Sequence, residues 1–153
     1  MAVYKLFPYK DTTLYSFYPK MNTGIDPIIE TFNINLSINV NPQVSRFLTE
    51  FVQSEIEDVI NNKISGTQWD VNLRAFIATA EGIVESTDLS VHPVAQYWWN
   101  GTGTYLDQPQ TDDGASWDYA SFSGSGVWTA SGSDGLNYIT SSWNSTYTTQ
   151  GGG

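Results

Sequence analysis

The sequence predicts an all-β protein, an antiparallel β-sandwich of the jelly-roll type with one short helix near residues 54–61. The first observation is composition: Thr, Ser, Asn and Gly are plentiful, 14% of residues are aromatic and only 14% are charged. Such a mixture is typical of short strands joined by many turns. The second observation is the run Phe32–Val40, where every even-numbered residue is apolar and every odd-numbered residue is polar. Strict period-two alternation predicts a strand with one buried and one wet face.

The other strands are predicted from shorter apolar and aromatic runs bounded by proline, glycine or asparagine. Eight or nine short strands at this spacing favour a sandwich or a barrel. At 153 residues the chain is long enough to bury its own core, so we expect a single domain over 1–153. The remaining runs are Val3–Phe7, Thr12–Tyr18, Val44–Val52, Trp69–Thr79, Leu89–Trp99, a short strand at Phe122, Val127–Ala130 and Leu136–Thr140.

Two of these elements need a choice between alternatives. Residues 44–64 also fit helical spacing, and we interpret them as a strand to about Val52 followed by a helix capped by Ser54 with Glu57 three residues later. Pro93 interrupts the run 89–99, and a proline inside a strand is confined to a sheet edge or a bend.

Charge and composition exclude several classes of partner. The net charge is −10 with only six Lys and Arg, which disfavours nucleic acid and anionic membranes because both require a cationic face. The chain has no cysteine, so it forms no disulfide and no thiolate metal site. The N-terminus lacks the apolar segment of a signal peptide, and no apolar run approaches the roughly 20 residues of a membrane span.

The stretch 98–119, WWNGTGTYLDQPQTDDGASWDY, predicts a long loop between two strands that is rich in tryptophan, aspartate and glycine. Its aromatic side chains either form a stacking platform for a sugar or cover the open end of the sandwich core. Adjacent Trp98 and Trp99 point to opposite sides of an extended chain, so one is expected to pack and one to be free for a neighbour or ligand. The candidate binding or interface residues are Trp98, Trp99, Tyr105, Trp117 and Tyr119.

The same stretch contains a weak candidate for a calcium site. Carboxylates and backbone carbonyls are the ligands that a hard cation prefers. The spacing matches no loop of defined coordination order, and Asp113-Gly114 also fits a hairpin turn. We expect no cofactor, with calcium as the alternative, and the candidate ligands are Asp107, Asp112, Asp113 and Asp118.

The sequence indicates a protein without enzymatic activity. His92 is the only histidine, and we expect it to be structural. Residues 114–118, GASWD, approach the nucleophile-elbow pattern around Ser116 but lack its final glycine. The acid pairs Asp112–Asp113 and Glu55/Glu57 could support glycoside hydrolysis, yet turns and a short helix normally leave such acids solvated.

The order of motifs resembles a known family layout. The segments are Tyr18-Pro19, residues 22–30 (NTGIDPIIE), 45–48 (SRFL), 73–80 (LRAFIATA), 91–94 (VHPV), 99–103 (WNGTG) and 113–117 (DGASW). This layout, over residues 12–143, resembles structural proteins of tailed phages, particularly marine phages with contractile tails. It is more distantly similar to DNRLRE-type sandwich domains of bacterial surface and polysaccharide-binding proteins.

The resemblance implies a virion structural protein of the head, collar or tail, present in many copies and released by lysis without a signal peptide. Its partners would be other virion proteins and further copies of itself, held by strand edges and the aromatic loop. The alternative is a carbohydrate-binding module for host adsorption, and a third hypothesis is a calcium-stabilised adhesin. Related domains continue into further strands beyond the point where this chain ends at Gly153. We therefore expect that a neighbouring copy or partner completes the sheet, or that the protein extends further.

Overall fold

The computed structural model describes residues 3–34, 43–66, 69–80, 91–92, 94, 96–122 and 126–128. The chain divides into two compact units. The first contains Met1–Tyr9 and Glu50–Ser90, and the second contains Lys10–Thr49 and Val91–Gly153. Two of the three boundaries between the units fall within strands described below, and the third falls between Ser90 and Val91.

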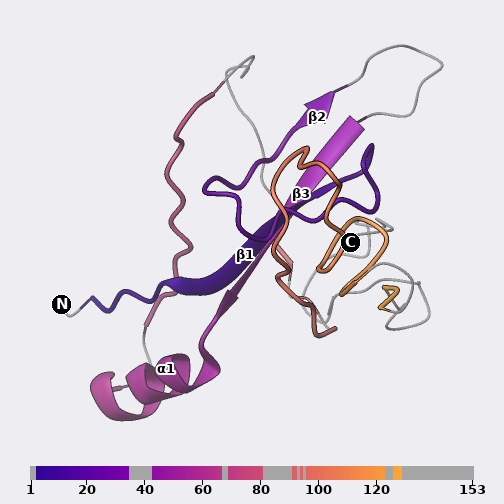
Figure 1. Ribbon diagram of the computed structural model, residues 1–153. Coiled ribbons are helices and arrows are strands. Elements are labelled where there is room, and N and C mark those ends of the chain that lie inside the picture. Colours follow the sequence, from indigo (N-terminus) through magenta and orange to yellow (C-terminus); the bar gives the residue numbers. More distant parts are fainter. Residues whose placement is uncertain are drawn as a thin grey trace, which may run out of the picture. The chain divides into compact units, whose positions relative to one another are not determined.

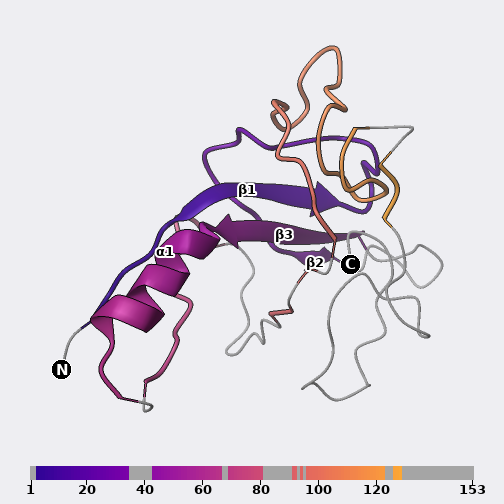
Figure 2. The same ribbon diagram turned by 90° about the horizontal axis from the view of Figure 1, so that it is seen from below.

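The regular core of the fold is a small antiparallel sheet of three strands, β1 (Pro8–Tyr15), β2 (Asn33–Ile34) and β3 (Gln43–Phe51). Their order is β1-β3-β2, and Figure 2 shows β1 and β3 side by side with opposite directions. β2 pairs with β3 in the register Asn33↔Val44 and Ile34↔Gln43. The long strand β3 therefore lies in the centre and supplies hydrogen bonds to both neighbours.

The prediction of an all-β chain with one short helix is confirmed at this coarse level. The strand predicted over 44–52 is β3, and Thr12–Tyr18 overlaps β1, which ends at Tyr15. The separate strand predicted at Val3–Phe7 is wrong, because residues 3–7 are irregular and β1 begins at Pro8. Proline suits the first residue of a strand, since its missing N–H is not required there. Of the alternating run 32–40, residues 35–40 lie outside the described residues.

Three further strand predictions are wrong where the structure describes them. Residues 69–80 and 96–99 are not in strands, and Phe122 lies in a bend. Val127 forms only an isolated bridge with Tyr119. Alternation shows that two faces differ in polarity, but a strand also requires a neighbouring backbone for its hydrogen bonds. The predicted strand at 136–140 lies outside the described residues.

The helix expected near residues 54–61 is confirmed as α1 (Gln53–Asp58), followed by the π-helical turn η1 (Val59–Lys63) (Figure 1). The predicted cap at Ser54 is wrong, because the N-cap is Val52 and no side chain caps the helix. Pairs of side chains four residues apart stabilise the surface instead. Gln53 Nε2 donates to Glu57 Oε1 at 2.9 Å, and Asn62 Nδ2 donates to Asp58 Oδ1 at 2.7 Å. In the described part of the chain, no helix is long and apolar enough to cross a membrane.

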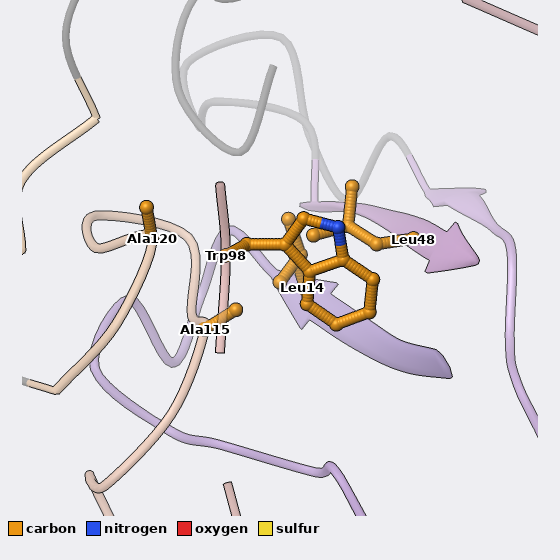
Figure 3. Packing of buried hydrophobic residues seen from close by; sticks show 5 residues of the cluster. All are labelled: Leu14, Leu48, Trp98, Ala115 and Ala120. Atoms are coloured by element: carbon orange, nitrogen blue, oxygen red, sulfur yellow. The ribbon is translucent and has the colours of Figure 1, made fainter. Parts of the chain in front are cut away.

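The hydrophobic core lies in the second unit, where loops pack against the sheet. Figure 3 shows the indole of Trp98 beside Leu14 of β1 and Leu48 of β3, with two alanines from the following loops. Trp117 and Trp128 are partly buried against this cluster. The buried members of the core are Leu14, Leu48, Trp98, Ala115 and Ala120.

Candidate functional site

The loops of the second unit meet at the side chain of Asn22, which is fully buried. Its Nδ2 donates to the carbonyl oxygens of Asn100 at 2.7 Å and Ala115 at 2.9 Å. Its Oδ1 accepts from the backbone N–H groups of Gly24 at 3.1 Å and Gly103 at 2.9 Å. Both donors and both acceptor positions of the amide are therefore satisfied. One side chain holds three segments, 22–24, 100–103 and 115, in a fixed arrangement.

Close approach to Asn22 explains the glycines around it. Gly101 adopts a φ of +77°, and a Cβ at this residue would overlap the Asn22 side chain, with Asn22 Cγ only 2.6 Å away. A Cβ on Gly24 would likewise overlap the carbonyl of Asn100. Glycine permits both the left-handed backbone and the short separation between chains. These glycines are packing residues of the loop cluster, which we define as residues 21–26, 98–107 and 111–120.

Carboxylates of the loop cluster stabilise its loops by accepting hydrogen bonds from backbone N–H groups. Asp113 accepts from Thr102 N at 2.9 Å and from Thr102 Oγ1 at 2.7 Å. Asp26 accepts from the N–H of Tyr105, at 3.0 Å to its nearer oxygen. Asp107 accepts from Thr111 N at 2.9 Å. Charge-assisted bonds of this kind fix the course of a loop more strongly than neutral ones.

The pKa values of two of these acids shift in opposite directions. Hydrogen bonds from Thr111, first from its side chain and then from its backbone N–H, lower the pKa of Asp107. Burial raises the pKa of Asp26, and the hydrogen bond from Tyr105 only partly opposes that effect. The ionised form is thus favoured at Asp107 and disfavoured at Asp26.

The candidate calcium ligands serve separate purposes in the structure. Asp107 and Asp113 bind backbone amides of their own loops, while the side chains of Asp112 and Asp118 are exposed. Among the residues that the structure describes, no group of three or more His, Asp or Glu side chains is arranged to hold a metal ion.

The two adjacent tryptophans have opposite environments, as the alternation of an extended chain predicts. Trp98 is 3% exposed in the core, whereas Trp99 is 54% exposed. The ring of Trp99 lies beside that of Tyr97, with centroids 6.5 Å apart and an angle of 49° between planes. Tyr97 is itself 67% exposed. Of the adjacent tryptophans, only Trp99 can meet a ligand or a neighbouring protein.

Cations cover the other tryptophans of the predicted set. Lys10 Nζ lies 4.3 Å from the ring centroid of Trp98 and donates to the Trp98 carbonyl at 2.7 Å. The Arg46 guanidinium lies 4.9 Å from the ring centroid of Trp117. Contacts of this type stabilise a partly buried indole and exclude other molecules from its face. Trp98 and Trp117 therefore belong to the packing interpretation of the aromatic loop. Tyr119 is half-buried.

Tyr105 lies in a different aromatic group from the tryptophans. Its ring centroid is 5.1 Å from that of Tyr15 and 6.3 Å from that of Tyr18. Phe17 and Phe32 complete this group around Tyr15. Burial, with a 2.6 Å hydrogen bond from the Tyr15 hydroxyl to Glu30 Oε2, raises the pKa of Tyr15 above its ordinary value. The five predicted binding residues thus do not form one platform.

Of the residues considered for catalysis, Ser116 is buried and Glu57 forms a hydrogen bond on the surface of the helix. Ser116 is 1% exposed, and its carbonyl accepts a hydrogen bond from Trp128 Nε1 at 2.9 Å. Glu57 pairs with Gln53 on the surface of α1. His92 is half-buried and lies apart in sequence from both.

Sequence reasoning missed two residues of this region: Asn22, whose side chain joins the loops, and Tyr97, whose exposed ring lies beside that of Trp99. Asn22 lies in the segment 22–30 that contributes to the family resemblance, but the carbonyl groups that it binds lie 78 to 93 residues away in the sequence. A dense set of glycines at 101, 103 and 114 was the available signal, because several close backbone approaches imply a shared buried partner. Tyr97 carried no signal beyond its proximity to the Trp98–Trp99 pair.

Comparison of the chain with protein-family models, with curated protein sequences and with solved structures finds no match.

Proposed function

We propose that this chain is a structural protein of a tailed-phage virion, non-enzymatic and present in many copies. Its partners are further copies of itself and other virion proteins, and its location is the head, collar or tail of the particle. The motif order of the sequence is the starting point, and features of both units support an assembly role.

The observation that carries the proposal is an apolar segment in the first unit that has no cover within the described residues. Residues 69–80, here called the arm, are exposed along their whole length and run as an extended trace without a strand arrow (Figure 1). Val71 is 81% exposed, Phe76 85% and Ile77 77%. Soluble monomers rarely expose so many large apolar side chains in one continuous stretch. Assembly with another chain would remove them from water.

The loop cluster of the second unit supports the same role in a different way. The buried bonds of Asn22 and the carboxylate–amide bonds of Asp26 and Asp113 hold its loops in place. A stiff surface is suited to repeated identical contacts, because little conformational entropy is lost when it binds. We also propose that the three-stranded sheet is part of an antiparallel sandwich of jelly-roll type, completed by further strands of this chain or of a partner.

The test is the composition of the purified particle. We expect mass spectrometry of gradient-purified virions of the phage encoding this chain to detect its peptides at many copies per particle. Their absence from particles, with the protein present in the infected lysate, would contradict the proposal. Immunogold labelling of intact particles then assigns the head, collar or tail.

A second candidate function is glycan binding, favoured by the exposed pair Tyr97 and Trp99. Lys10 Nζ lies 4.6 Å from the ring centroid of Tyr97 and covers one of its faces, so the exposed ring of Trp99 is the main surface suited to stacking on the apolar face of a sugar. Glycan-array binding that disappears in Trp99→Ala but persists in Phe122→Ala, an equally exposed aromatic at 54%, would support this candidate. Trp98→Ala is unsuitable for the test, because Trp98 belongs to the core.

A further inference from the structure

The arm has the side-chain pattern of a strand but lacks strand partners among the described residues. Its sequence is WDVNLRAFIATA, with apolar residues at each odd position from 69 to 77. No backbone hydrogen bond joins residues 69–80 to another part of the chain that the structure describes. An extended segment with a continuous apolar face and unpaired backbone groups is suited to pair with a strand of another molecule.

The charges of the arm are self-complementary. Asp70 and Arg74 are both exposed and are placed symmetrically on either side of Asn72. If two arms pair antiparallel about Asn72, each Asp70 lies directly opposite the Arg74 of the other copy. The two arms then form two identical ion pairs, as a twofold axis requires.

The same register also matches the apolar face. Val71 lies opposite Leu73, and Trp69 lies opposite Ala75, so that a large side chain meets a small one. A shift by one residue would place apolar residues opposite polar ones, and a shift by two would separate both ion pairs. Opposite charges that face each other across strands stabilise the pairing, and like charges in those positions destabilise it. Charge therefore selects one register among the possible antiparallel pairings.

We propose that the arm pairs antiparallel with the arm of a second copy of this chain, centred on Asn72 and fixed by reciprocal Asp70–Arg74 ion pairs. This inference rests on the proposed assembly function and names one of its contacts. A second copy is the favoured partner because both charges find their complement in an identical arm. The net charge of −10 on each chain opposes this pairing and makes it weaker. A two-stranded ribbon is only marginally stable alone, so the pairing is weak in dilute solution and is strengthened where copies are held close together.

Charge exchange tests the proposal with the full chain. Sedimentation velocity up to about 500 µM at about 0.15 M salt, which screens the repulsion between whole chains more than the close ion pairs, should show a monomer–dimer equilibrium for the wild type, with a Kd in the upper micromolar range. Asp70→Arg alone and Arg74→Asp alone should each weaken association by about tenfold or more, which corresponds to about 1.4 kcal/mol. The double variant should recover wild-type association, because both ion pairs are restored with reversed sign. An equimolar mixture of the two single variants should also recover it, because the mixed dimer contains one ion pair of reversed sign and one wild-type pair.

Failure is distinguishable from a folding defect, since both residues are exposed and circular dichroism should be unchanged. A wild type that stays monomeric throughout this range overturns the proposal, as does a mixture that associates no better than either variant alone. The absence of the chain from virions would contradict the proposed function but leave these results unaffected. Conversely, a monomeric chain that is abundant in virions would overturn only the arm pairing.

The register has its own test because the chain contains no cysteine. Asn72→Cys places two thiols opposite each other across the proposed twofold axis, where Cβ atoms lie close enough for a disulfide after small adjustments. Mild oxidation should convert this variant to a covalent dimer at least tenfold faster than Ala78→Cys, an exposed control in the same arm. Equal rates for the two variants would overturn the Asn72-centred register.

Discussion

The loop cluster of the second unit and the arm of the first unit differ in which side chains they bury and which they expose. In the loop cluster, a fully buried amide at Asn22 satisfies carbonyl and N–H groups of three segments. In the arm, large apolar side chains such as Phe76 are 85% exposed, and no backbone hydrogen bonds are made to other described residues. The polar side chain is inside and the apolar ones are outside.

This contrast indicates that the two regions would respond differently to assembly. The buried amide that joins the loop cluster has its hydrogen bonds complete within one chain, so the loop cluster is expected to be the same before and after assembly. The arm exposes its apolar side chains and makes no backbone hydrogen bonds to other described residues, so its environment should change when copies meet. The proposed assembly role would use both kinds of surface, one that is fixed within the chain and one that gains contacts from a neighbouring copy.

The largest expected effect comes from Asn22→Ala. The substitution leaves two buried N–H groups and two buried carbonyls without their partner, and each such group costs about 1–3 kcal/mol. We expect a loss of roughly 4 kcal/mol or more in the free energy of unfolding, measured by urea denaturation with tryptophan fluorescence. Asn62→Ala, which removes one exposed hydrogen bond to Asp58, is the control and should change stability by less than about 0.5 kcal/mol. Equal losses in the two variants would contradict the role of Asn22.

The next effect separates the two adjacent tryptophans. Trp98→Ala removes a core indole that is 3% exposed and should cost about 3–5 kcal/mol in the free energy of unfolding. Trp99→Ala removes a side chain that is 54% exposed and should cost less than about 1 kcal/mol. Denaturation of both variants checks this difference. A larger loss at Trp99 than at Trp98 would show that the core is assigned wrongly.

Adding one methyl group to a glycine in each unit compares how tightly the two glycines are packed, and Gly101→Ala is the variant in the loop cluster. Its φ of +77° and its overlap with Asn22 should together cost about 2–4 kcal/mol. Gly66 in the first unit has a φ of +100° with open space around the added Cβ. Gly66→Ala should therefore cost only the backbone strain, about 1 kcal/mol. Thermal unfolding of both variants would expose an error in the packing account if their melting temperatures fell equally.

The smallest expected effect is a pH dependence with opposite signs at two loop carboxylates. Burial raises the pKa of Asp26 above 3.8 in the folded chain, so wild type should lose stability relative to Asp26→Asn as pH rises from about 3.8 through that raised pKa. The pKa of Asp107 is lowered below 3.8, so wild type should gain stability relative to Asp107→Asn as pH rises from that lowered pKa to about 3.8. Urea midpoints measured between pH 3 and pH 6 test the signs. The same slope for both variants would be inconsistent with these assignments.

Sequence reasoning worked best where local pattern decides structure. The strand at 44–52 and the short helix after it are β3 and α1, and the opposite environments of Trp98 and Trp99 follow from the geometry of an extended chain. It was wrong for the arm, whose alternation predicted a strand at 69–79 that has no partner in the described chain. Local pattern specifies the faces of a strand, whereas pairing depends on residues distant in sequence or on another molecule.

The candidate site was predicted less well for the same reason. Its boundaries were anticipated, since residues 98–119 form most of the loop cluster. Its centre was missed, because Asn22 reaches partners 78 to 93 residues away and no local pattern encodes such contacts. The five predicted aromatics divide into core, cation-covered and exposed members, a division that depends on the positions of Lys10 and Arg46.

Hydrogen exchange by mass spectrometry, at low and at high protein concentration, tests the contrast between the loop cluster and the arm most directly. The amides of Gly24, Gly103 and Ala115 should be protected at both concentrations, because their bonds are complete within one chain. The amides of residues 69–77 should exchange rapidly in the dilute chain and become protected only at high concentration. Protection of the arm in the dilute monomer, or exchange of the loop-cluster amides as fast as that of the arm, would contradict the account.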